Sequence, residues 1–341
     1  MKNKVELKNS GGKIVPHSDF RVGTNTTIPS KKRRRIGTWN VRSLGICGKL
    51  ENIKLEMKRH NIDILGMSEI KWPGQGDFWS DDFRVIFSGD DNKIAGVGII
   101  MNKDMGKRVN TVIQYSSRII AIKMDTKPVN TIIIQVYMPT TGHRDDEIEE
   151  MYEQIDEVIK ISKGKDNMII MGDWNAVAGD VKEQGISGTF GLGKRNQRGE
   201  RLIEFCKEQN LVITNTLFSQ PKRRRYTWTM PGGGTRYQID YILVKKRYQN
   251  QVKQSKSFPG ADIDSDHNLI IMESNLSLKK TENKQITRKK WYLDKLKDEE
   301  IRYNYSEGVN NKLKELQIKE QNEPYGINDD WEAPHSRKKK I

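Results

Sequence analysis

Apolar runs that stop abruptly at a polar residue recur along this chain and constrain its fold more than any other feature. The clearest case is Met168–Asn175, where the apolar run ends in Gly172 and Asp173 and Asn175 follow with one residue between them. A short apolar run closed by glycine is typical of a buried strand. Because alternate strand residues point to the same side, the two polar side chains are expected to project together from the end of a strand. The same residues also fit a strand followed by a simple Asx turn.

Other strand-like runs also carry a polar side chain where the run stops. Pro139 ends one of them and leaves a tyrosine at its edge. A few segments with helical spacing separate the runs, and the strongest covers residues 145–162. Side chains at separate strand ends meet only if the strands share one edge of a sheet, where they would form a single polar cluster. Its members would be Asn40, Glu69, Tyr137, Asp173, Asn175, Asp240, Asp266 and His267.

Such a cluster would have a definite chemistry. Carboxylates that converge repel one another and need a cation, and a set of oxygen ligands favours Mg²⁺ or Mn²⁺. A histidine beside an acid, with an amide donor and a tyrosine nearby, suits stabilisation of a phosphoryl transition state. The pattern therefore indicates a metal-dependent reaction at phosphorus.

At this point the sequence resembles the endonuclease/exonuclease/phosphatase superfamily. Each motif is weak alone, but together they occur in the family's order and cover roughly residues 36–272. The resemblance implies an α/β fold of the α+β type, a four-layer sandwich of two mainly antiparallel β-sheets flanked by helices. The motifs read Thr-Trp-Asn40-Val, Ser-Glu69, Val-Tyr137-Met-Pro, Gly-Asp173-Trp-Asn175, and Ile-Asp240-Tyr with Ser-Asp266-His267.

Longer phrases narrow the resemblance. Gly-Thr-Trp-Asn-Val-Arg-Ser-Leu, Gln-Arg-Gly-Glu-Arg-Leu and Gln-Ile-Asp-Tyr-Ile are similar to the endonuclease domain of RTE-type non-LTR retrotransposons. They also resemble the vertebrate craniofacial development protein 2-like proteins, which carry such a domain. The Lys-Lys-Trp-Tyr-Leu-Asp-Lys-Leu stretch from Lys289 resembles the linker that precedes reverse transcriptase in those elements. No reverse transcriptase follows it here, so we expect a truncated or domesticated copy.

The resemblance implies a metal site made by Glu69 with Asn40 and Asp266. One position departs from the family pattern. Abasic-site members of the family place an aspartate two residues after the first Asn, and this chain has Arg42 there. We therefore expect fewer acids to hold the metal ion, without strict specificity for abasic sites.

The remaining cluster residues take catalytic roles by the same resemblance. Asp173 would orient and deprotonate the attacking water, and Asn175 would hold a phosphate oxygen. His267, oriented by Asp240 and assisted by Tyr137, would stabilise the pentacovalent phosphate. Asn40 would belong both to the metal site and to the catalytic residues.

Most of the net charge of +15 lies in the flanks of the chain. Residues 1–35 carry ten Lys/Arg and two Asp/Glu, or +8, and are expected to form a disordered basic leader. Its basic run Lys31–Arg35 could serve as a nuclear-import signal, as an arm on phosphates, or as a solvated edge. Residues 278–341 carry sixteen Lys/Arg and twelve Asp/Glu, or +4, and are expected to form a charged, partly helical appendage. Residues 36–277 would form the catalytic domain.

The segment Lys222–Trp228 joins a basic cluster to alternating aromatic residues. Cations beside aromatic rings suit contacts to phosphates together with stacking on bases or sugars. We expect a hairpin at the sheet rim, leading into the strand that bears Asp240. A hairpin whose charges only face solvent is the alternative. The residues expected to contact DNA are Arg223, Arg224, Arg225, Tyr226 and Trp228.

The leading hypothesis is a Mg²⁺-dependent DNA endonuclease, with Mn²⁺ as a substitute, that nicks one strand and leaves a 3′-hydroxyl. One alternative is a non-catalytic nucleic-acid-binding or scaffold protein derived from such a nuclease. Another is a phosphoesterase of the same fold that acts on lipid or inositol phosphates. The basic and aromatic segment favours the nuclease.

Two cysteines, Cys47 and Cys206, cannot make a disulfide framework, which is typical of a reduced intracellular protein. The sequence has no apolar signal segment and no apolar run of bilayer-spanning length, so no membrane partner is expected. We expect a monomer that binds DNA, needs no organic cofactor, and resides in the nucleus with a cytoplasmic pool as an alternative.

Overall fold

The computed structural model describes residues 33–140, 142–161, 166–232, 234–279 and 296–322. The chain divides into two units, one up to Lys280 and one from Thr281. The second contains the helix α5 (Glu299–Asn322), whose described side chains are exposed. Most of the predicted leader and the linker-like stretch from Lys289 lie outside the described residues. Within the described ranges, no helix is long and apolar enough to cross a membrane.

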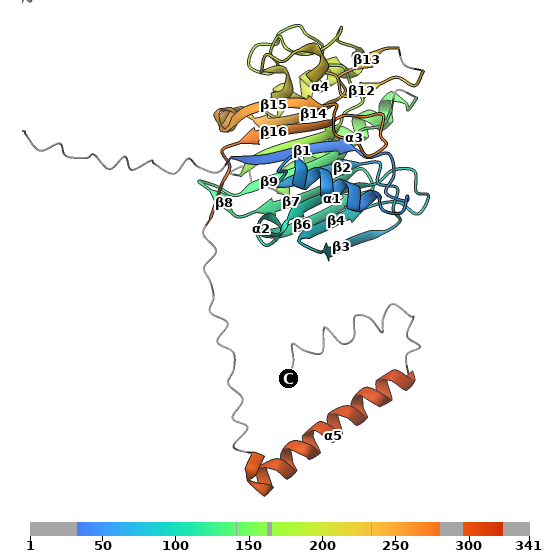
Figure 1. The fold of residues 1–341 in the computed structure, drawn as a ribbon, viewed down its shortest axis with the longest axis vertical. Helices are drawn as coiled ribbons and strands as arrows, with labels where there is room; N and C mark the ends of the chain where they lie inside the picture. The colour runs from blue at the N-terminus through green and yellow to red at the C-terminus, as the bar shows by residue number, and fades with distance from the viewer. Residues whose placement is uncertain (1–32, 141, 162–165, 233, 280–295, 323–341) are drawn as a thin grey trace, which may run out of the picture. The chain divides into compact units, whose positions relative to one another are not determined.

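The first unit contains two large β-sheets (Figure 1). The parallel pairs are β1–β2 and β9–β10, and the other neighbours in both sheets are antiparallel. The seven-stranded sheet has the order β15 (Val252–Phe258), β16 (Leu269–Ser274), β1 (Arg34–Asn40), β2 (Ile64–Ser68), β5 (Val97–Asn102), β4 (Phe83–Ser88) and β3 (Gln75–Ser80). The six-stranded sheet has the order β11 (Leu211–Ile213), β14 (Asp240–Lys245), β10 (Asn167–Asp173), β9 (Thr131–Tyr137), β7 (Ile119–Met124) and β6 (Val109–Ser116).

Shorter elements complete the unit. Two small ribbons pair β12 (Trp228–Thr229) with β13 (Arg236–Tyr237) and β8 (Thr126–Lys127) with β17 (Ser277–Leu278). The α-helices are α1 (Lys49–Arg59), α2 (Lys103–Gly106), α3 (Asp145–Ile161) and α4 (Gln197–Glu208). The 3₁₀ helices are η1 (Thr214–Thr216), η2 (Lys222–Arg224) and η3 (Lys246–Gln251).

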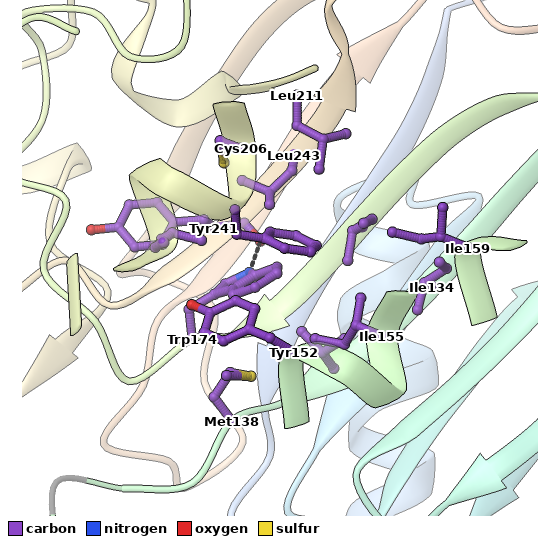
Figure 2. Close-up of a cluster of buried hydrophobic side chains, with 14 of the residues drawn as sticks. Ile134, Met138, Tyr152, Ile155, Ile159, Trp174, Cys206, Leu211, Tyr241 and Leu243 are labelled. Atoms are coloured by element: carbon purple, nitrogen blue, oxygen red, sulfur yellow. Dashed lines mark hydrogen bonds between the residues drawn. The ribbon is translucent and has the colours of Figure 1, made fainter. Parts of the chain in front are cut away.

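Three apolar layers hold these elements together. One lies between the sheets, where isoleucines such as Ile64 of β2 and Ile133 of β9 belong to the same buried cluster. A second joins α1 to the outer face of the seven-stranded sheet through Ile53. The third joins α3 and α4 to the six-stranded sheet, and Figure 2 shows it around Trp174 and Tyr241. The four-layer sandwich of two mainly antiparallel sheets expected from the sequence is confirmed.

A buried glutamine connects the two sheets. Gln135 of β9 donates through Nε2 to Ser68 Oγ of β2 at 2.9 Å, and its Oε1 accepts from Thr38 of β1 at 3.2 Å. The amide fits because residue 66 is glycine, where a Cβ would lie 1.8 Å from Gln135 Oε1. The bonded residues of β1 and β2 lie one or two positions before Asn40 and Glu69, so this contact also fixes the two strand ends.

Two expectations about local structure are wrong. The segment from Lys222 is not a hairpin: Pro221, with φ near −60°, starts the 3₁₀ helix η2, and the hairpin is formed afterwards by β12 and β13. The basic run is not wholly a leader either, because Arg34 and Arg35 belong to β1. Arg34 is nearly buried and pairs with Asp63 at 3.0 Å.

Candidate active site

The end of β10 begins the site. The strand stops at Asp173, which lies opposite Tyr137 of β9 on one side and Asp240 of β14 on the other. Gly172 permits the close pairing of β9 and β10, because a Cβ there would lie 2.0 Å from the Val136 carbonyl oxygen. The glycine that marks the strand end in the sequence is therefore required by backbone packing.

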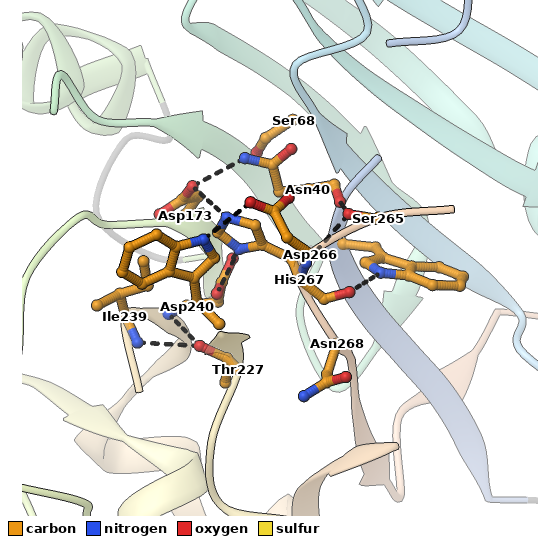
Figure 3. A network of polar contacts seen from close by, with 12 residues as sticks. Asn40, Ser68, Asp173, Thr227, Ile239, Asp240, Ser265, Asp266, His267 and Asn268 are labelled. Carbon is orange, nitrogen blue, oxygen red and sulfur yellow. Dashed lines mark hydrogen bonds and ion pairs between the residues drawn. The ribbon is translucent and has the colours of Figure 1, made fainter. Parts of the chain in front are cut away.

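Asn40 links the two sheets at this edge (Figure 3). Its buried amide donates through Nδ2 to Asp173 Oδ2 at 3.0 Å and to Glu69 Oε1 at 2.9 Å. Its Oδ1 accepts from the backbone N–H of Arg42 at 3.1 Å. One side chain thus holds a carboxylate from each sheet in a fixed position.

His267 lies between two buried carboxylates. Its Nδ1 contacts Asp240 Oδ2 at 3.0 Å, and its Nε2 lies 3.9 Å from Asp173 Oδ2. Burial by itself lowers the pKa of this imidazole, but the anionic Asp240 and Asp173 prevail and raise it to about 9. The imidazole is therefore protonated at neutral pH, and its Nε2 faces the residue expected to act as the base.

The electrostatics of Asp173 suit a base. The carboxyl group is buried, and burial together with the neighbouring Asp240 raises its pKa well above the usual range of an aspartate. His267 and the hydrogen bond from Asn40 act in the opposite direction. A general base works best when its pKa lies near the working pH, and this environment moves the carboxyl group in that direction.

Glu69 is held by three partners. It accepts hydrogen bonds at Oε1 from Asn40 and from the Tyr137 hydroxyl, the latter at 2.9 Å, and Lys71 lies 3.4 Å from its Oε2. Burial and the charge of Glu69 raise the pKa of Tyr137 above its usual value, so the phenol stays protonated and serves as a donor. Glu69 itself has φ of 54°, a strained conformation for a non-glycine residue.

Asp266 has a partner that sequence reasoning assigned to another role. The indole Nε1 of Trp228 donates to Asp266 Oδ2 at 3.0 Å, and the Trp228 ring lies beside the His267 ring with centroids 6.3 Å apart. Trp228 was expected to stack on DNA, and the structure places it as an orienting donor for an acid of the site. The alternation of aromatic residues gave no sign of this bond.

Hydroxyl groups and one further indole position the histidine, and none of them was predicted. Ser265 Oγ donates to the Asn40 carbonyl at 2.7 Å and accepts from the His267 backbone N–H at 3.1 Å. Trp39 Nε1 donates to the His267 carbonyl at 2.8 Å. Thr227 Oγ1 accepts hydrogen bonds from the backbone N–H groups of Ile239 and Asp240. Ser265 could have been found from its place in Ser-Asp-His, a local hydroxyl-turn pattern.

Asn175 is the remaining predicted residue. Its backbone N–H donates to Asp173 Oδ1 at 3.1 Å, and its Nδ2 donates to the Met138 carbonyl at 2.8 Å. A side-chain amide has two N–H donors, so the second remains for a phosphate oxygen. Its φ of 46° again marks a strained backbone at this edge.

These residues surround an open pocket of about 490 Å³. Three of the predicted residues, Asn40, Tyr137 and Asp240, stand behind the pocket wall and hold the others. Arg42, which occupies the position where abasic-site members of the family have an aspartate, lies in the pocket wall. The predicted residues that line the pocket are Glu69, Asp173, Asn175, Asp266 and His267.

Comparison with known proteins identifies the family of this chain. A model of the endonuclease/exonuclease/phosphatase family matches residues 37–267. The chain belongs to this family. Craniofacial development protein 2 of Bos taurus is 46% identical over 250 residues, which cover 73% of this chain and 42% of the relative. The chain thus spans less than half the length of the curated relatives it matches.

Solved structures share the fold at low sequence identity. The endonuclease domain of TRAS1, a telomere-specific non-LTR retrotransposon, has a TM-score of 0.52 at 17% identity and covers 71% of this chain and 98% of its own. The 3′ phosphatase NExo from Neisseria has a TM-score of 0.54 at 19% identity and covers 71% and 99%. The predicted likeness to a retrotransposon endonuclease domain is confirmed at the level of the fold.

The predicted DNA-contacting residues do not all lie at this pocket. Trp228 lines it together with Met230 and Tyr237 of the β12–β13 hairpin. Arg225 instead donates to the Gln220 carbonyl at 2.6 Å. Arg223 and Arg224 line a different cavity, and Tyr226 lies under the guanidinium of Arg236, 4.5 Å from its ring centroid. Contact of these five residues with DNA stays a prediction.

Two groups of residues could be considered for a metal ion. Asp173, Asp240 and His267 offer ligand atoms within 4.8 Å of one another. In that group, however, the protonated imidazole already supplies the positive charge and its Nδ1 is bonded to Asp240. The carboxylates of Glu69 and Asp266 line the open pocket, and oxygen donors of this kind fit Mg²⁺ or Mn²⁺. Asn40 has its Oδ1 bonded to Arg42, so its part in metal binding stays a prediction.

Proposed function

We propose that this chain is a divalent-metal-dependent DNA endonuclease that hydrolyses a phosphodiester bond, nicks one strand and leaves a 3′-hydroxyl. The observation that carries the proposal is that Asp173, His267, Glu69 and Asp266 line one pocket, with Asp173 Oδ2 3.9 Å from His267 Nε2. A base and a cationic hydrogen-bond donor in one pocket are what water attack on a phosphodiester requires. Of the structures with this fold, one is a retrotransposon endonuclease domain and one was solved with a product DNA hairpin.

The residues divide the reaction between them. Asp173 takes the proton of a water molecule as its oxygen attacks phosphorus, and Asn40 keeps the carboxylate in place. The P–O3′ bond breaks, the leaving oxygen takes up a proton from solvent water and becomes the 3′-hydroxyl, and the phosphate remains on the 5′ end of the other fragment. His267 donates through Nε2 to a phosphate oxygen that gains charge in the transition state, and Asp240 keeps the imidazole protonated.

A divalent cation completes the site. Glu69 and Asp266 would hold Mg²⁺ or Mn²⁺, which when bound supplies further positive charge to the phosphate oxygens. Trp228 and Tyr137 orient these two acids through their hydrogen bonds. We propose that the protein acts as a monomer in the nucleus, where its DNA substrate resides. Size-exclusion chromatography and imaging of a tagged chain test these two points.

The experiment is a plasmid-nicking assay. The purified chain should convert supercoiled plasmid to open circles with Mg²⁺ or Mn²⁺ and should be silent with EDTA. Asp173→Asn should slow nicking by about 10²–10⁴-fold, because the variant loses its general base. The control is Asp91→Asn, which removes an exposed carboxyl group outside the pocket and should nick normally.

Three results would count against the proposal. Nicking that survives complete chelation would contradict the metal requirement. Near-normal turnover of Asp173→Asn would contradict the assignment of the base. Tight DNA binding without any turnover of the unmodified chain would favour the non-catalytic alternative.

A further inference from the structure

Several cations gather around one aromatic ring at the end of the edge strand β15. The ring belongs to Phe258, and the cavity beside it has a volume of about 260 Å³. The Arg224 guanidinium lies 5.3 Å from the ring centroid and Lys256 Nζ lies 5.5 Å from it, while the His60 ring meets it edge-on at 5.2 Å. The residues that line the cavity are Arg59, His60, Arg223, Arg224 and Phe258–Gly260.

The protein balances the charges around this cavity only in part. Arg59 pairs with Glu56, and Arg35 on the same side pairs with Glu273. Across residues 33–279, as far as the structure describes them, no carboxylate forms an ion pair with Arg223, Arg224 or Lys256. Burial and the nearby Arg224 lower the pKa of Lys256, and Glu273 acts in the opposite direction. Like charges that crowd together without a counterion favour an anion as the missing partner.

We propose that this cavity binds a backbone phosphate of DNA at a distance from the bond that is cut, through Arg223, Arg224 and Lys256. The Phe258 ring fixes Arg224 and Lys256 by cation–π contact, so the cations are held in place before DNA arrives. Arg59 stands at the rim with its charge partly neutralised by Glu56. This proposal rests on the proposed function in one respect, because it takes DNA as the ligand.

The chain connects this cavity to the catalytic pocket by a short path. Arg224 lines the cavity, and Trp228, four residues later, lines the catalytic pocket. Four residues span at most about 14 Å even when fully extended. Because a duplex rises about 3.4 Å per base pair, that span corresponds to about four base pairs. One bound duplex can therefore reach both the catalytic pocket and the cavity. The contact at the cavity would set how far the duplex must extend beyond the bond that is cut.

The test measures binding separately from cleavage. Asp173→Asn serves as the background, so that DNA stays intact in Mg²⁺, and fluorescence anisotropy gives Kd over a range of salt concentrations. Adding Arg224→Ala with Lys256→Ala should weaken binding to a long duplex by about tenfold. It should also lower the slope of log Kd against log salt by about one, the change expected when the protein no longer neutralises one phosphate.

Two further variants in the same background serve as controls. Arg247→Ala with Lys253→Ala removes the same two kinds of charge outside the cavity, and should change Kd and the salt slope much less. Arg224→Lys with Lys256→Arg keeps both charges and should bind nearly as the background does. Circular dichroism melting shows whether each variant is folded, and the charge-keeping pair keeps the test decisive if the alanine pair is unstable.

Duplex length gives an independent measurement. If the cavity holds a phosphate, the duplex can be shortened by a few base pairs on the side of the scissile bond that reaches the cavity. This shortening should remove the difference in Kd between the alanine pair and its background. Equal effects of the cavity pair and the control pair on Kd and salt slope would overturn the proposal. Weakened binding in the cavity pair, with no nicking by the unmodified chain, would refute the nuclease and leave the phosphate site standing.

Discussion

His267 places one positively charged side chain between two acids, where a metal ion was expected. Convergent carboxylates are expected to need a metal ion, yet the imidazolium between Asp173 and Asp240 already offsets part of their negative charge. In the proposed function, Glu69 and Asp266 would hold the metal ion in the wall of the pocket. Asp173 and His267 line the same pocket as Glu69 and Asp266, so the buried ion cluster and the proposed metal ligands face one cavity.

The titration of His267 tests this arrangement without any DNA. In metal-free protein, NMR of the histidine ring protons should show an imidazole with a pKa near 9, and the signal should be absent from His267→Gln. Asp240→Asn removes the larger of the two anionic influences, so the pKa should fall in that variant. If the His267 imidazole titrates at the ordinary pKa of about 6.5 in the unmodified protein, that result would contradict the ion cluster.

The same pKa shift affects stability. The folded-state pKa of His267 lies above that of an exposed imidazole, about 6.5, so its protonation favours the folded state below that pH. The contribution should fade as the pH rises from there through 9. In urea titrations at several pH values, Asp240→Asn should show less of this decline than the unmodified protein.

At the scale of single elements, the contact between the two sheets depends on a glycine. Gly66→Ala would place a methyl group against Gln135 Oε1, and overpacking of this kind costs about 1–3 kcal/mol in the free energy of unfolding. Shortening the glutamine should relieve the clash. Gly66→Ala should therefore cost less in a Gln135→Ala background than in the unmodified chain, as chemical denaturation of the four proteins can measure. Additive costs would show that the two residues do not meet.

The sequence predicts some elements well and others poorly, for physical reasons. Strand ends such as Asp173 are visible because an apolar run and a glycine are local signals. The bond from Trp228 to Asp266 is not visible, since it joins residues that are 38 positions apart in the chain. The η2 turn was missed because its arginines resemble a solvated strand, although Pro221 already favoured a turn. Local patterns therefore gave the strands and most of the cluster, and the contacts that orient the acids needed the fold.

At the scale of the whole molecule, the start of the folded unit can be located by truncation. A chain lacking residues 1–32 keeps all of β1 and should melt at an unchanged temperature. Removal of residues 1–35 also takes away Arg34 and leaves the buried Asp63 without its cation, which should cost about 3–5 kcal/mol. Calorimetry of the two truncations compares them directly. Equal stability would mean that the ion pair contributes nothing.

The shorter truncation also tests the role of the leader. Residues 1–32 hold seven Lys/Arg and two Asp/Glu, so their removal should weaken binding to all duplexes alike and flatten the salt dependence. The positions of nicks on one plasmid should stay the same, because phosphate contacts carry no sequence information. A redistribution of nicks after this deletion would show that the leader reads DNA.

The place of β1 in its sheet has a consequence for synthesis. This first strand lies between β2 and β16, and its pairing with β16 joins Arg34 to Ser274. During translation, Asn40, Glu69 and Asp173 leave the ribosome long before Asp266 and His267 do. Until β16 emerges, β1 has an unpaired edge that other chains can bind, and the catalytic pocket lacks one wall. The pocket would thus be complete only after the residues of β16 have been made.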